Sequence, residues 1–189
     1  MADHAPSLSL CVYCGSRPGT DASYTRAARD LGTRLGERGW TLVYGGARVG
    51  LMGSVADATL AAGGRVIGVI PEVLMSREVA HHGLTELHVV QTMHQRKHLM
   101  AERADAFLAL PGGVGTLEEL FEAWTWRQLG YHRKPLALLN VAGYYDELLA
   151  FMRRSVAMDL TSSQTHEHLL VDTEVDGLLD QVAAQRLRP

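Results

Sequence analysis

Residues 105–120 read DAFLALPGGVGTLEEL, an apolar run followed by a glycine-rich turn and then by a helical pattern. The run 105–110 has the length of a buried strand, and a helix is expected from Thr116 onward. Glycine allows other groups to approach the backbone closely, and a helix N-terminus offers unpaired N–H groups and the positive end of a dipole. The stretch therefore predicts a strand–loop–helix unit whose loop binds an anion, with phosphate as the first candidate.

Short apolar runs alternate with amphipathic stretches along the rest of the chain. Strands are predicted at 8–13, 40–44, 65–70, 86–90, 105–110, 135–139 and 168–171. Helices are predicted at 23–38, 50–62, 93–104, 116–129, 144–158 and 174–186. Most strand segments are near-continuous in Val, Leu, Ile and Ala, which is typical of strands buried on both faces of a parallel sheet. We therefore expect an α/β fold, a doubly wound parallel sheet of about seven strands with helices on both faces.

Composition restricts the class of protein. The 189 residues are expected to form a single domain, 1–189, with residues 1–7 disordered. Eighteen Lys and Arg against 21 Asp and Glu leave a charge of −3, which gives no basic excess for nucleic acid or an anionic membrane. No apolar run approaches the ~18–20 residues that span a bilayer, and the first residues do not resemble a secretory signal. Two cysteines suit a reducing compartment, so we expect a cytoplasmic protein.

Two more glycine-bearing segments follow predicted strands. CGSR at 14–17 follows the first strand, and GGARVGLMG at 45–53 follows the second. Ligands of open parallel sheets bind outside the carboxyl ends of the strands, so Ser16, Gly45 and Gly46 are candidate ligand contacts. Each segment alone could be a tight turn. Together the three favour a phosphate-bearing ligand.

The glycine spacing narrows the kind of phosphate compound. The pattern G-x-x-x-x-G-K-[ST] of P-loop nucleotidases is absent, and G-x-G-x-x-G does not follow the first strand. No acidic residue closes the next strand, where a dinucleotide ribose would need it. These absences argue against a P-loop nucleotidase and against NAD, so a mononucleotide fits better.

Two charged clusters each have two interpretations. Arg96 and Lys97 flank an apolar helical stripe, so they either extend into water along the core or turn into the cleft and bind phosphate or a carboxylate. Thr116 and Glu119 have the T-x-x-E spacing of a capping box. Alternatively, a carboxylate there faces a sugar, where it would stabilise an oxocarbenium-like state and activate water. His94 and His98 lack the H-E-x-x-H context of zinc peptidases, so no metal is expected.

Two motifs together resemble those of a known family. Residues 111–119, PGGVGTLEE, match PGGxGTxxE, and residues 93–97, MHQRK, match MHxRK, both of the LONELY GUY family. The resemblance extends over residues 8–160. It implies a Rossmann-like homodimer whose partner subunit helps to build the site. It also implies hydrolysis of the N-glycosidic bond of N6-substituted adenosine 5′-monophosphates, the cytokinin nucleotides, or of AMP, to free base and ribose 5-phosphate.

The same resemblance implies roles for particular residues. Arg96 and Glu119 resemble the catalytic pair of the family, and no metal or cofactor is implied. The substrate contacts that it implies are Glu78, Lys97, Gly112, Gly113, Val114, Gly115, Thr116, Leu117, Glu118 and Thr125.

Two alternatives stay open. A nucleotide-binding or carrier protein of the same fold could use the phosphate loop without cleavage, because fold does not imply function. A pyridoxal phosphate decarboxylase would need a Schiff-base lysine, for which the sequence offers only Lys97 and Lys134.

Overall fold

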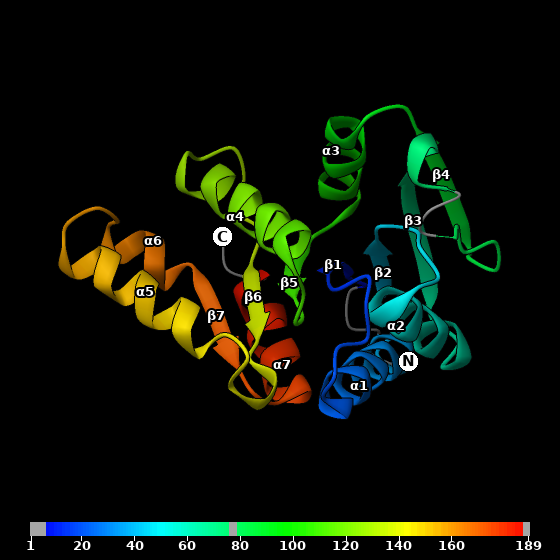
Figure 1. Ribbon diagram of the computed structural model, residues 1–189, viewed down its shortest axis with the longest axis horizontal. Helices are drawn as coiled ribbons and strands as arrows, with labels where there is room; N and C mark the ends of the chain where they lie inside the picture. Colours follow the sequence, from blue (N-terminus) through cyan, green and yellow to red (C-terminus); the bar gives the residue numbers. More distant parts are fainter. Residues whose placement is uncertain (1–6, 76–78, 187–189) are drawn as a thin grey trace, which may run out of the picture.

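In the computed structural model, which describes residues 7–75 and 79–186, seven strands form one parallel sheet (Figure 1). Their order is β4-β3-β2-β1-β5-β6-β7. The strands are β1 Ser9–Tyr13, β2 Thr41–Tyr44, β3 Arg65–Pro71, β4 Glu86–Val90, β5 Ala106–Ala109, β6 Leu136–Leu139 and β7 Leu169–Asp172. The chain adds β2, β3 and β4 on one side of β1 and then returns to place β5 on its other side. The direction of winding therefore reverses between β1 and β5, as in a doubly wound sheet.

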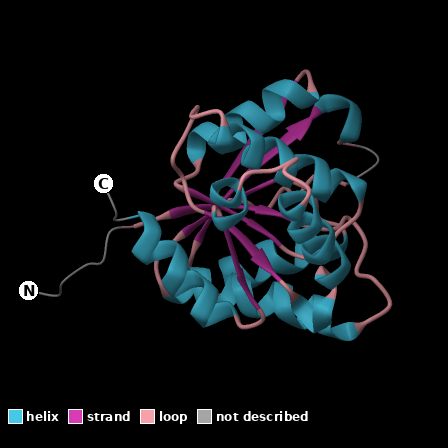
Figure 2. Cartoon of the chain, turned by 90° about the vertical axis from the view of Figure 1, so that its left-hand side faces the viewer, coloured by secondary structure: helices cyan, strands magenta, loops and turns pink. Residues whose placement is uncertain are grey.

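Helices cover both faces of the sheet, as Figure 2 shows. They are α1 Ala22–Glu37, α2 Gly50–Ala61, α3 Met93–Arg103, α4 Val114–Gln128, α5 Asp146–Ala157, α6 Ser163–Glu167 and α7 Val175–Arg186, with short 3-10 turns η1 Glu72–Leu74 and η2 Val141–Gly143. Buried side chains of α1, α2 and α7 pack on one face, and those of α3, α4 and α5 pack on the other. The Rossmann-like α/β architecture expected from the sequence is thus confirmed.

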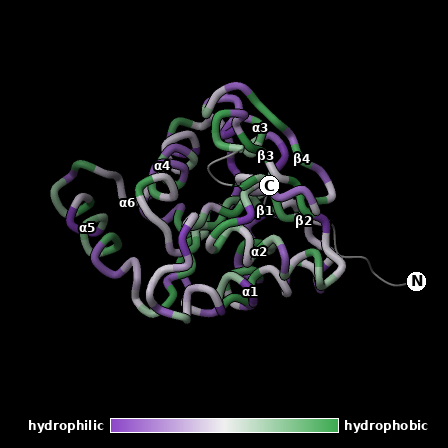
Figure 3. Tube along the Cα trace, turned by 45° about the vertical axis from the view of Figure 1, so that its right-hand side comes forward, coloured by the Kyte–Doolittle hydropathy of each residue, from purple (hydrophilic) through white to green (hydrophobic). Residues whose placement is uncertain are grey.

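Strand side chains alternate between two hydrophobic cores. Leu10, Leu42 and Leu108 belong to the core under α1, α2 and α7, whereas their neighbours Cys11, Val43 and Phe107 belong to the other. Burial on both faces explains why these strands are continuous apolar runs rather than alternating ones. Figure 3 shows the hydrophobic residues concentrated along the central strands.

Most predicted boundaries lie within a few residues of the observed ones, and the exceptions have local causes. α5 begins at Asp146 rather than at residue 144, because the backbone of Tyr145 (φ −102°, ψ 8°) is not helical and Tyr145 is the N-cap. The sequence pattern did not predict the five-residue helix α6. α4 begins at Val114, two residues before the predicted start.

Two further expectations concern the disorder of residues 1–7 and the absence of a membrane-spanning segment. Residues 1–6 of the segment expected to be disordered lie outside the described residues, and the Ser7 hydroxyl donates to the Gly39 carbonyl at 3.2 Å. Within the described ranges, no helix has both the length and the apolar character needed to cross a membrane.

Candidate active site

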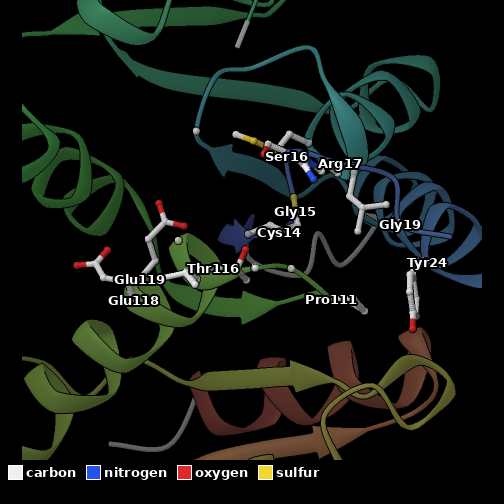
Figure 4. A pocket seen from close by; sticks show the side chains of 18 of the residues that line it. Cys14, Gly15, Ser16, Arg17, Gly19, Tyr24, Pro111, Thr116, Glu118 and Glu119 are labelled. Atoms are coloured by element: carbon white, nitrogen blue, oxygen red, sulfur yellow. The ribbon is translucent and has the colours of Figure 1, made fainter. Parts of the chain in front are cut away.

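The carboxyl ends of β1, β2 and β5 border one cavity of about 550 Å³. Its walls include residues 14–19 after β1, Gly45 after β2 and residues 111–116 after β5. Figure 4 shows Thr116, Glu118 and Glu119 of α4 on one side of this cavity and the segment from Cys14 to Arg17 on the other. The cavity therefore lies at the point where the winding of the sheet reverses, which is where such folds bind their ligands.

The turn after β5 packs tightly on one side and is open on the other. The Gly15 N–H donates to the Pro111 carbonyl at 3.1 Å, and a Cβ on Gly112 would overlap Thr116 and lie 2.9 Å from the Gly15 nitrogen. A Cβ on Gly113 or Gly115, in contrast, would meet no atom of the described residues within 4 Å. Packing thus requires glycine at 112, whereas 113 and 115 leave room for a ligand to approach the backbone.

The beginning of α4 decides between the two interpretations of Thr116 and Glu119. The N-cap of α4 is Gly113, which has no side chain that could cap the helix, and Thr116 is the third residue inside the helix. The capping-box interpretation is therefore wrong. A capping box is present at α3 instead, where Thr92 Oγ1 accepts from the Gln95 N–H at 3.1 Å and Gln95 Oε1 accepts from the Thr92 N–H at 3.3 Å.

Arg96 turns inward to the strand ends. Its side chain is buried, with Nε donating to the Val69 carbonyl at 3.1 Å and Nη2 donating to the Gly45 carbonyl at 2.9 Å. A Cβ at position 45 would overlap the guanidinium, so Gly45 makes the space that Arg96 occupies. The interpretation in which this cation extends into water is therefore wrong.

Arg96 and Glu119 both act electrostatically on one thiol in the cavity. Burial is the main cause of the raised pKa of Cys14, the negative charge of Glu119 adds to it, and Arg96 opposes it. All three side chains line the cavity. A cation and a carboxylate thus line the same cavity beside the end of β1.

Lys97 is buried between α3 and α4 and is not among the residues that line the cavity. Its Nζ lies 2.5 Å from Glu118 Oε1 and 2.9 Å from Glu122 Oε2. Burial alone would lower the pKa of Lys97, but the hydrogen bonds to the two glutamates outweigh it and the net shift is upward. Lys97 is therefore a charged bridge between α3 and α4, and the interpretation in which its ammonium extends into water is wrong.

The predicted site residues fall into three groups. Those that line the cavity are Ser16, Gly45, Arg96, Gly112, Gly113, Val114, Gly115, Thr116, Glu118 and Glu119. Gly46, Lys97, Leu117 and Thr125 are not among the lining residues, and the Thr125 hydroxyl donates to the Phe121 carbonyl at 2.7 Å. Glu78 lies outside the described residues.

Several residues that line the cavity carry no sequence signal, and the two lysines of the chain lie elsewhere. Tyr24, Met52 and Tyr144 line the cavity, and no local pattern marks them as ligand contacts. Neither Lys97 nor Lys134 is among the lining residues, and Lys134 Nζ donates to the Ala101 carbonyl at 2.6 Å. The cavity therefore contains no lysine from the described residues that could form a Schiff base.

A doubly wound sheet with a glycine turn and a cavity at its switch point defines a Rossmann-like protein, in which ligands bind at this point of the sheet. The chain belongs to the LOG family of this class: the family described as "Possible lysine decarboxylase" matches residues 52–182. A cytokinin riboside 5′-monophosphate phosphoribohydrolase from Rhodococcoides fascians is 49% identical over 90% of this chain and 87% of the relative.

Plant relatives agree with this assignment, and a solved structure shares the fold. The probable cytokinin riboside 5′-monophosphate phosphoribohydrolase LOGL5 from Oryza sativa is 56% identical over 90% of this chain and 69% of its own length. LOG1 from Arabidopsis thaliana, of the same named activity, is 51% identical over 86% and 76%. The molybdenum cofactor carrier protein from Chlamydomonas reinhardtii superimposes with a TM-score of 0.74 at 21% identity, covering 97% of this chain and 100% of that one. This last likeness concerns the fold alone.

Proposed function

We propose that the protein hydrolyses the N-glycosidic bond of N6-substituted adenosine 5′-monophosphates, and of AMP, to the free base and ribose 5-phosphate. The observation that carries the proposal is the position of Glu119, which follows the open glycine turn by about one helical turn and lines the same cavity as Arg96. An anion bound at the turn would hold the attached sugar near this carboxylate. The named activity of the relatives, at 49% to 56% identity, supports the same reaction.

The first turn of α4 would hold the 5′-phosphate. Backbone N–H groups at a helix N-terminus have no partner inside the helix, and the dipole there favours negative charge. Gly113 contributes no side chain as N-cap, and the absence of Cβ atoms at 113 and 115 lets phosphate oxygens come close. A nucleoside monophosphate is therefore the small-molecule partner that we propose.

The chemistry would need one carboxylate, one cation and water. As the bond from ribose C1′ to the base nitrogen breaks, positive charge develops on the sugar, and Glu119 would stabilise it. Glu119 would then accept a proton from the attacking water, whose oxygen bonds to C1′, while the base departs with its electron pair and takes up a proton. Arg96 would orient Glu119 or the sugar phosphate from its anchored position on Gly45 and Val69.

The other residues predicted to contact the substrate are Lys97, Glu78, Gly46, Leu117 and Thr125, and the structure bears differently on them. The bridge from Lys97 to Glu118 and Glu122 favours a role in holding α3 against α4 rather than in touching the substrate. Glu78, Gly46, Leu117 and Thr125 stay predicted substrate contacts.

A homodimer completes the proposal. Val114 and Met93 line the cavity although these residues are 85% and 41% exposed, and a second copy of the chain would cover them. Such apolar exposure beside a site is typical of an interaction surface. We also propose a cytoplasmic location, which the free thiols of Cys11 and Cys14 favour.

Replacing Glu119 by glutamine tests the chemistry. Glu119→Gln should fold and bind nucleotide like the parent protein, but hydrolyse isopentenyladenosine 5′-monophosphate at least ~100-fold more slowly, because glutamine can neither take a proton nor supply negative charge. Free base is measured by chromatography. Glu147→Gln, on an exposed position of α5, is the matched control and should leave the rate unchanged.

Two results would contradict the proposal. Unchanged turnover of Glu119→Gln would remove this carboxylate from the reaction, and bound but intact nucleotide with the parent protein would favour a carrier. The phosphate site is tested separately with a panel of nucleosides and their mono-, di- and triphosphates. If nucleosides without phosphate are cleaved as well as monophosphates, the proposed role of the glycine turn is wrong.

A further inference from the structure

Two consecutive tyrosines donate their hydroxyls to carbonyls of the turn after β5. Tyr144 Oη donates to the Gly112 carbonyl and Tyr145 Oη to the Leu110 carbonyl, each at 2.6 Å. These distances are at the short end of the range for O–H···O hydrogen bonds. The turn that precedes α4 is therefore held by side chains about thirty residues later in the sequence.

The bond from Tyr144 fixes the direction of a peptide group at the proposed phosphate site. In a planar trans peptide the C=O and the following N–H point in opposite directions. With the Gly112 oxygen held on the tyrosine, the Gly113 N–H is directed away from the tyrosine. Gly113 is the N-cap of α4, and a Cβ placed on it would enter open space.

Tyr144 is itself held in place on several sides. The Asn140 side chain accepts from the Tyr145 N–H at 2.8 Å and donates to Asp146 Oδ1 at 2.7 Å, which fixes the turn that presents the two tyrosines. The Tyr144 ring makes edge contacts with Tyr145 and Tyr24, with centroids 4.9 and 5.4 Å apart. The hydroxyl is thus preorganised on Gly112.

The two tyrosines differ in what their loss would affect. Tyr145 is fully buried in the core, so its replacement would disturb packing. Tyr144 is 42% exposed and lines the cavity beside the turn. Removing only its hydroxyl therefore changes the turn with little effect on the core.

We propose that Tyr144 is a positioning residue for the substrate phosphate: its hydroxyl holds the Gly112 carbonyl back so that the Gly113 N–H faces the anion. The inference rests on the proposed function for the identity of the ligand. It predicts that the hydroxyl contributes to binding only where the ligand carries a phosphate.

The test compares Tyr144→Phe with Tyr131→Phe, whose tyrosine is 78% exposed and is not among the cavity residues. Dissociation constants for AMP and for adenosine are measured by calorimetry in the Glu119→Gln background, so that AMP is not consumed. Tyr144→Phe should weaken AMP binding about fivefold, the size expected for one hydrogen bond, and adenosine binding less than about twofold. Tyr131→Phe should change neither constant.

Kinetics with an intact Glu119 supply a second readout. Tyr144→Phe should raise KM for the 5′-monophosphate about fivefold and leave kcat within about twofold, with an unchanged melting temperature. A merely structural role would lower the melting temperature and would not distinguish AMP from adenosine.

Three outcomes would overturn the inference: unchanged AMP affinity in Tyr144→Phe, equal weakening for AMP and adenosine, or equal affinity of the parent for both ligands. Failure of the proposed function looks different. If the protein with an intact Glu119 binds AMP more tightly than adenosine but cleaves neither, the hydrolase proposal fails, and the binding comparison still decides the role of Tyr144.

Discussion

Glycines that look alike in the sequence meet two different requirements. At 45 and 112 a side chain would collide with Arg96 or Thr116, so the protein itself requires glycine. At 113 and 115 a methyl group would enter the open cavity. We infer that the ligand, rather than the fold, requires glycine at these two positions.

Gly115→Ala should therefore affect stability and binding in opposite directions. Alanine has the higher helix propensity, so the variant should unfold with equal or greater free energy, by up to about 1 kcal/mol. AMP binding should weaken at least tenfold, because the new methyl group occupies space proposed for phosphate oxygens. Urea denaturation measures the first quantity and calorimetry the second.

Gly112→Ala is the control for that experiment, since its Cβ would overlap Thr116 and should reduce stability. Full AMP affinity in Gly115→Ala would show that the anion does not approach this part of α4.

At the level of residues, the sequence predicted which helices carry the candidate side chains better than it predicted where those side chains point. Arg96 was correctly placed at the edge of an inward-facing stripe, but its carbonyl partners belong to β3 and to the turn after β2, which no local pattern connects to it. Thr116 was wrongly interpreted as a cap because the helix begins two residues earlier, at Val114. Thr92 and Gln95 have the T-x-x-Q spacing of the box that α3 does form, so that signal was readable.

At the scale of elements, the site depends on how α3 and α4 lie over the sheet. α3 packs over β1, β2, β3 and β4, whereas α4 packs over β1 and β5. Figure 1 shows the two helices as separate elements beside the sheet. Arg96 belongs to the first helix and Glu119 to the second, and the ammonium of Lys97 bridges the helices beside them.

Lys97→Met should lower both stability and turnover. The variant leaves the carboxylates of Glu118 and Glu122, whose side chains are 50% and 26% exposed, without their shared cation. Because water reaches both groups, we expect a loss of only about 1–2 kcal/mol in the free energy of unfolding. Turnover should fall further than stability explains, since the spacing of Arg96 and Glu119 changes.

Lys134→Met provides the comparison, because this lysine is bonded to the Ala101 carbonyl and is not a cavity residue. It should leave kcat unchanged. Denaturation curves and steady-state rates give both quantities, and wild-type kcat in Lys97→Met would contradict the role of the bridge.

Elements with a strong apolar period were predicted well, and those made by tertiary contacts were not. Apolar runs and flanking glycines revealed all seven strands of the described residues. η2 and its left-handed Ala142 lie beside Asn140 and beside tyrosines that bond the turn after β5, and these contacts are not visible in a local stretch of sequence. α6 is only five residues long, too short to show a helical period.

For the molecule as a whole, the sequence predicted the class of fold but not the order of the strands. Alternating strands and helices are typical of a doubly wound sheet, yet the reversal that brings β5 beside β1 is a matter of topology. That reversal brings residues 14–19 and 111–116 into one cavity. The position of the glycine segments at strand ends could be predicted from the sequence alone, whereas the pairing of Arg96 with Glu119 came only from the family resemblance.

A dimer in solution is the prediction at this scale. Analytical ultracentrifugation of the purified protein should give twice the mass of the 20.7 kDa chain at micromolar concentration. Val114→Asp, which places a charge on the exposed residue at the cavity, should shift the protein toward monomer. A monomer for the unmodified chain would contradict the proposed assembly.

The beginnings of α3 and α4 differ in a way that affects the whole molecule. The side chains of Thr92 and Gln95 form hydrogen bonds with backbone amides at the start of α3. The N-cap of α4 is Gly113, which has no side chain that could bond the first amides of that helix. The anion proposed to bind there would supply hydrogen-bond partners to amides that no side chain at the N-cap of α4 bonds, and a ligand that binds only the native state stabilises it. The resistance of this protein to heat should therefore vary with how much of its substrate or product is present.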